Sequence, residues 1–128
     1  MIQEFSQYIT QGIVRKITPD SMRAQSLLMD SQRKLAVLDR QVQALGIDDQ
    51  LANEYIVLCY DIIMLCIRSK LYQNGFVASG LGAHEAEVAY LQELDISQKD
   101  ILFMDQLHIF EMECSIMVNN LMQSMHKK

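Results

Sequence analysis

The stretch from Tyr55 to Ile67 constrains the fold most, because every residue in it except Asp61 is apolar or aromatic. A helix built from such a run leaves no face for water, so other elements must surround it. The run is too short, and too closely flanked by Glu54, Arg68 and Lys70, to span a bilayer. We therefore expect it to form the central helix of a helical bundle.

The length of 128 residues predicts a single domain, residues 1–128, that is long enough to bury a core. A net charge of −5 and a pI near 5.0 argue against a general nucleic-acid binder, which normally carries a basic excess. Cys59, Cys66 and Cys114 are odd in number and fall inside predicted helices, which fits reduced, buried thiols better than disulfides. Met1 is not followed by a segment typical of a secretory signal. These observations favour a cytoplasmic protein.

Helix signals divide the chain into a weak N-terminal helix or arm, residues 1–16, and a bundle over residues 18–126. Thr18 is a good N-cap, and Pro19 suits the first helical position. The apolar stripe of the long helix that follows consists of Met22, Leu28, Leu35, Leu38, Val42 and Leu45. Gly46 ends this helix.

A second set of signals begins at Asp48–Asp49, which should cap the helix that contains the central run, and Gly75 should end it. We expect a surface loop over residues 75–82, a short helix over residues 84–94 with Val88 and Leu91 inward, and a last helix from Ser97 to about residue 125. The sequence thus predicts an all-α fold, a four- to five-helix up-down bundle.

Several short motifs in this order of helices resemble the HEPN superfamily, helical bundles often encoded beside minimal nucleotidyltransferases. The resemblance covers about residues 18–118. The motifs that carry it are Tyr60-Asp61 in the apolar helix, Leu71-Tyr-Gln-Asn-Gly-Phe76, Gly82-Ala-His84-Glu-Ala86, Leu91-Gln-Glu-Leu94 and Phe103-Met-Asp-Gln-Leu107. It implies a HEPN-like bundle, a homodimer, and a nucleotidyltransferase partner in a toxin–antitoxin-like pair.

The resemblance fails where that family keeps its ribonuclease chemistry. Members that cleave RNA carry an Arg on the last helix, with a His or Tyr four to six residues later. Here Glu111-Met112 or Glu113-Cys114 stands in place of the Arg, and residues 69–128 contain no Arg. A carboxylate at that position would repel the scissile phosphate. We therefore predict no catalytic residues of the family type.

The side chains that could still form a polar cleft are those of Asp61, Arg68, His84, His108 and Glu111. We expect His84 to hydrogen-bond loop backbone. Asp61 lies in the apolar run, so it should pair with a tyrosine or with Arg68 to avoid the cost of burial. Asp105, His108 and Glu111 have half the pattern of a bundle metal site, and because the other ligands are missing we predict neither metal nor cofactor.

Three functions follow from these observations. The first is a non-catalytic, HEPN-like binding module, dimeric through its Met-rich last helix. The second is a ribonuclease with an atypical site, using His84 or His108 beside a cation. The third is a bundle that binds a small ligand or nucleotide, which would need an apolar pocket beside residues 75–82.

Overall fold

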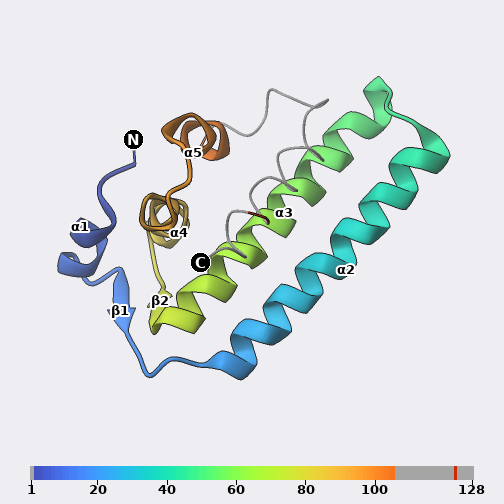
Figure 1. The fold of residues 1–128 in the computed structure, drawn as a ribbon. Helices are drawn as coiled ribbons and strands as arrows, with labels where there is room; N and C mark the ends of the chain where they lie inside the picture. Colours follow the sequence, from blue (N-terminus) through green and yellow to red (C-terminus); the bar gives the residue numbers. More distant parts are fainter. Residues whose placement is uncertain (1, 106–122, 124–128) are drawn as a thin grey trace.

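The computed structural model describes residues 2–105 and residue 123, and these are mostly helical with one small antiparallel sheet (Figure 1). Its elements in chain order are α1 (Phe5–Thr10), β1 (Val14–Lys16), α2 (Ser21–Leu45), α3 (Asp49–Asn74), β2 (Phe76–Ala78), α4 (Ala83–Ala89), the 3-10 helix η1 (Tyr90–Leu94) and α5 (Gln98–Asp105). The start of the predicted last helix is therefore present as α5. His108, Glu111 and Cys114 lie outside the described residues.

Helices α2 and α3 form a long antiparallel hairpin whose ends are set by local capping (Figure 1). The cap of α2 is Asp20, whose carboxylate accepts a hydrogen bond from the backbone N–H of Arg23 at 3.0 Å, so the prediction of Thr18 and Pro19 as cap and first residue was wrong by two positions. An Asp carboxylate satisfies an open N–H and also complements the positive end of the helix. The predicted stop at Gly46 and cap at Asp48 are confirmed.

The end of α3 at Gly75 joins the hairpin to the N-terminal segment. Gly75 has φ = 82°, and a Cβ there would lie 2.7 Å from the carbonyl oxygen of Ile17, so only glycine fits. The N–H of Ile17 donates to the carbonyl of Gly75 at 2.8 Å, and the N–H of Asp20 donates to that of Tyr72 at 3.0 Å. The start of α2 is thereby held against the end of α3.

The sheet pairs two three-residue strands that lie about sixty residues apart in the chain, with Val14 opposite Ala78 and Lys16 opposite Phe76. Strands this short show no alternation of apolar and polar residues, so the sequence indicated an arm over residues 1–16 and a loop over 75–82. The pairing places α1 beside α4, where Phe5 packs against the rings of Phe76 and Tyr90. The apolar side of the N-terminal arm thus finds its partner within the chain.

The core lies where α3 meets α2 on one side and α4 with η1 on another. Leu38, Ile62, Ile67, Val88 and Leu91 are almost fully buried in it, as the sequence predicted for the two inward positions of the short helix. The ends of the α2 stripe are not part of it, because Met22 is 84% and Leu45 62% exposed.

The expectation that the central run leaves no face for water was wrong at two positions of α3. Val57 is 59% exposed, and Asp61 is exposed as well. Among the described residues, α3 is long and apolar enough to cross a membrane, since it extends beyond the run to 26 residues. Half of its most apolar 18-residue stretch is buried within the fold. Core helices of soluble proteins can be equally long and apolar.

Candidate functional site

The predicted cleft residues that the structure describes, Asp61, Arg68 and His84, do not meet in one cluster. His108 and Glu111 cannot be placed, because they lie outside the described residues. Instead the polar side chains along α3 and α4 form two separate pairs, and α3 also borders two pockets.

The first pair joins Tyr60 on α3 to His84 at the start of α4. The phenol oxygen of Tyr60 lies 2.9 Å from Nδ1 of His84 and also contacts Nε2, and the two rings are stacked with their centroids 5.2 Å apart. The partner of His84 is therefore a side chain rather than loop backbone, contrary to the sequence expectation. A phenol beside an exposed imidazole can hold or pass a proton.

The second pair joins Arg68 on α3 to Glu87 on α4. Nε of Arg68 donates to Oε2 of Glu87 at 2.9 Å, and Nη2 donates to Oε1 at 3.3 Å. The Glu87 side chain is 9% exposed and that of Arg68 is 43% exposed. A nearly buried carboxylate is stabilised by such a two-point contact, and this contact also compensates the arginine's charge.

Glu87 was missed in the sequence, although a signal was available. It stands between Ala86 and Val88–Ala89, all of which are buried. A carboxylate among inward-facing residues of a short helix needs a cation on the neighbouring helix, and Arg68 directly follows the apolar run. That reasoning would have paired the two.

Asp61 pairs with none of the partners expected for it among the described residues. Tyr60 contacts His84, Arg68 is bound by Glu87, and the hydroxyl of Tyr55 donates to the carbonyl of Gly46 at 3.0 Å. Because the Asp61 side chain is exposed, water solvates it and the predicted cost of burial does not arise.

One pocket, of about 280 Å³, lies beside the segment from Gly75 to Gly82. Apolar residues of α3 and β2 line it together with the Arg68–Glu87 pair. The residues that line it are Arg68, Leu71, Tyr72, Phe76, Val77, Ala78, Ala83 and Glu87.

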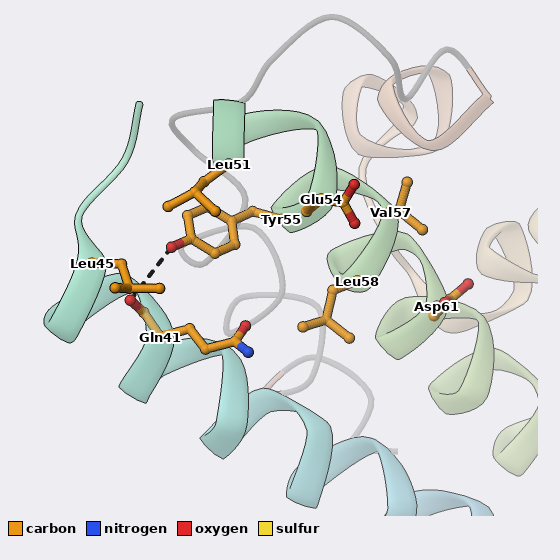
Figure 2. Close-up of a pocket in the computed structure, with 8 residues that line it drawn as sticks. All are labelled: Gln41, Leu45, Leu51, Glu54, Tyr55, Val57, Leu58 and Asp61. Carbon is orange, nitrogen blue, oxygen red and sulfur yellow. Dashed lines mark hydrogen bonds between the residues drawn. The ribbon is translucent and has the colours of Figure 1, made fainter. Parts of the chain in front are cut away.

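A larger open pocket, of about 410 Å³, lies near the tip of the α2–α3 hairpin, and we call it the hairpin pocket. It is lined by Gln41, Leu45, Leu51, Glu54, Tyr55, Val57, Leu58 and Asp61. Figure 2 shows Leu51, Tyr55 and Leu58 on the side of α3 toward α2, whereas Glu54, Val57 and Asp61 project away from α2. The pocket therefore has an apolar floor and an exposed edge that combines one valine with two carboxylates.

The remaining polar groups between α2 and α3 serve packing. The hydroxyl of Ser69 donates to the carbonyl of Ala24 at 2.6 Å, and that of Ser31 donates to the carbonyl of Leu28 at 2.6 Å. The thiol of Cys66 donates to the Ser31 oxygen at 3.4 Å, and burial raises the pKa of this thiol. A buried thiol with a raised pKa is a poor nucleophile.

In the part of the chain that the structure describes, no group of three or more His, Cys, Asp and Glu side chains is placed to hold a metal ion. Of the predicted half-site, His108 and Glu111 are outside the part described.

Comparisons with known proteins give no neighbour from which a function could be transferred. No protein-family model, no curated protein and no solved structure matches this chain.

Proposed function

We propose that this protein is a non-catalytic helical binding module that docks a protein partner on α3 where Val57 and Asp61 are exposed. The observation that carries the proposal is the hairpin pocket, where Leu45 and Val57 expose more than half of their surface beside a cavity of about 410 Å³. Single exposed apolar residues are ordinary, whereas an apolar cavity with exposed apolar edges is typical of an interaction site.

The charge arrangement along α3 and α4 supports a binding role over a ribonuclease. RNA cleavage needs positive charge directed at the phosphate beside the general acid or base. Arg68, like Tyr60, contacts a residue of α4, but its guanidinium is engaged by Glu87. His84 contacts the uncharged phenol of Tyr60.

The resemblance to the HEPN superfamily extends this proposal to the kind of partner. It suggests a homodimer and a nucleotidyltransferase partner in a toxin–antitoxin-like pair, acting in the cytoplasm. The protein encoded by the adjacent gene is therefore the first partner to test.

The test is co-purification of the full chain with that protein, using two matched variants. Val57→Asp places a charge at the edge of the hairpin pocket, and Leu81→Asp places the same charge on a residue that is 99% exposed and lines neither pocket. We expect Val57→Asp to abolish the complex and Leu81→Asp to leave it intact. A complex that survives both changes would refute docking on this face.

A second assay separates binding from catalysis. RNA incubated with the full chain should remain intact. Cleavage that disappears in His84→Ala and in Tyr60→Phe would instead support a ribonuclease built on that pair.

Binding of a small ligand is a second candidate function, favoured by the pocket of about 280 Å³ beside residues 75–82. Its size is close to the lower limit for ligand sites, and its lining combines the aromatic residues Tyr72 and Phe76 with Arg68. A ligand held there should raise the melting temperature of the wild type but not of Ala78→Trp, which would fill the pocket.

A further inference from the structure

The charged side chains that line the hairpin pocket are Glu54 and Asp61, and both are acidic and exposed. They lie seven residues apart on α3, which corresponds to two helical turns and about 10 Å along the axis. Val57 lies between them and is 59% exposed. The edge of the pocket is therefore a carboxylate, an apolar contact and a second carboxylate in one line.

We infer that the hairpin pocket takes an amphipathic helix of a partner protein, with an apolar side chain in the cavity and Lys or Arg seven residues apart. This inference rests on the proposed function and gives the partner its chemistry. A helix lying along α3 has the same rise per residue, so cations two turns apart meet Glu54 and Asp61 together. Their aliphatic stems lie over Val57 while the charged ends reach the carboxylates.

A partner helix that binds in a groove needs an apolar floor to receive its anchoring side chain. Leu51, Tyr55 and Leu58 provide it, and Leu45 at the end of α2 extends the apolar surface by a side chain that is 62% exposed. The floor is held in shape because the Tyr55 hydroxyl donates to the carbonyls of Gly46 and Gln41, at 3.0 and 3.4 Å. A preformed floor lowers the cost of ordering on binding.

A second copy of this chain fits the pocket less well. It does offer Arg33 and Arg40, which are exposed on α2 and also seven residues apart. Leu38 is buried toward α3, and the face with Arg33 and Arg40 lies about half a helical turn from it. The two arginines therefore point away from α3, whereas the pocket opens beside α3. If one copy docked on another in this way, two different surfaces would meet. Contacts of that kind add copy after copy into a filament unless the rotation between neighbouring copies closes a ring.

Nucleic acid and anionic membrane surfaces fit the edge of the pocket poorly. Both would bring negative charge against the carboxylates of Glu54 and Asp61. A cationic helix is the partner class whose charge and shape complement this edge.

The experiment is a selection from a library of displayed amphipathic helices, with the full chain as bait. We expect the bound helices to carry Lys or Arg at two positions seven residues apart. The double variant Glu54→Lys/Asp61→Lys should instead select Asp or Glu there. By fluorescence anisotropy, a selected cationic helix should bind the wild type about tenfold more tightly than the double variant.

The control is Glu4→Lys/Glu85→Lys, which changes the net charge equally at two exposed residues outside the pocket. It should keep the wild-type preference. Enriched helices without a charge preference, which lose binding to Val57→Asp, would overturn the inference and leave the proposed function intact.

Three other outcomes also overturn the inference. The first is that no helix is enriched, and the second is that the enriched helices bind Val57→Asp unchanged. The third is that the wild type self-associates in sedimentation, the charge-reversed variant does not, and no helix competes, which would assign the pocket to a second copy.

Discussion

The two sides of helix α3 differ sharply, although one apolar run contributes to both. On one side Ile62, Ile63 and Ile67 are at most 2% exposed, covered by the elements packed around them. On the other side Val57 is 59% exposed and Asp61 is exposed beside the hairpin pocket. Apolar composition therefore identifies a helix as central without indicating which of its residues the fold covers.

The largest predicted difference is in the free energy of unfolding when an aspartate replaces a buried or an exposed residue of α3. Ile63→Asp buries an unpaired carboxylate and should destabilise the fold by about 4 kcal/mol or more, enough to unfold a small domain. Val57→Asp should change the free energy of unfolding by about 0.5 kcal/mol or less, because water reaches the site. Urea titration followed by circular dichroism measures both. A folded Ile63→Asp protein with an unchanged midpoint would remove the distinction between the two sides.

A smaller effect is expected from shortening two leucines of the α2 stripe, one in its middle and one at its end. Leu38 has no exposed surface, so Leu38→Ala should cost about 2 to 5 kcal/mol through lost burial and the cavity left behind. Leu45 is 62% exposed at the pocket edge, and Leu45→Ala should cost about 0.5 kcal/mol or less. Equal losses in thermal unfolding would mean that the hairpin pocket is as tightly covered as the core.

Much of the helical framework could be predicted because its signals are local. Asp48 at the start of α3, Gly46 and Gly75 at the ends of the two long helices, and Ser97 before α5 act through neighbouring residues. The Ser97 oxygen accepts the Asp100 N–H at 3.2 Å, as the capping pattern predicted. The β1–β2 pairing was missed because it joins distant segments that are each too short for a periodic pattern.

The site was harder to predict, because every candidate role there depends on which residue comes opposite. The acidic side chain that is buried and paired is that of Glu87. Asp61, which we expected to be buried because it lies in the apolar run, is exposed. One position along a helix turns a side chain by about 100°. Periodicity alone leaves the direction of a lone polar residue open within an apolar run, and only the packing of α4 on α3 decides it.

The Arg68–Glu87 pair gives a test of intermediate size at the place where α4 packs on α3. Arg68→Met leaves the nearly buried Glu87 carboxylate without its cation, and should cost about 1 to 3 kcal/mol given that Arg68 is 43% exposed. Adding Glu87→Met should recover part of that loss, because two apolar side chains tolerate the burial. The double-mutant cycle in urea measures the coupling, and additive losses would show that the pair contributes nothing beyond each side chain alone.

The smallest predicted effect is a dependence of stability on alkaline pH. Burial raises the pKa of the Cys66 thiol above its ordinary value of 9.0, so the unfolded chain loses this proton first. The stability it contributes is present below that value and is lost as pH rises through the folded pKa. Desolvation lowers the pKa of Lys70 below 10.5, so its contribution has the opposite sign and stability rises through that window. Relative to the wild type, Cys66→Ala should lose stability less steeply between about pH 8 and pH 10 in urea titrations, and Lys70→Met more steeply. Identical slopes in all three proteins would mean that water reaches these two positions of α3 as freely as it reaches Asp61, and that the helix lacks a covered side at this end.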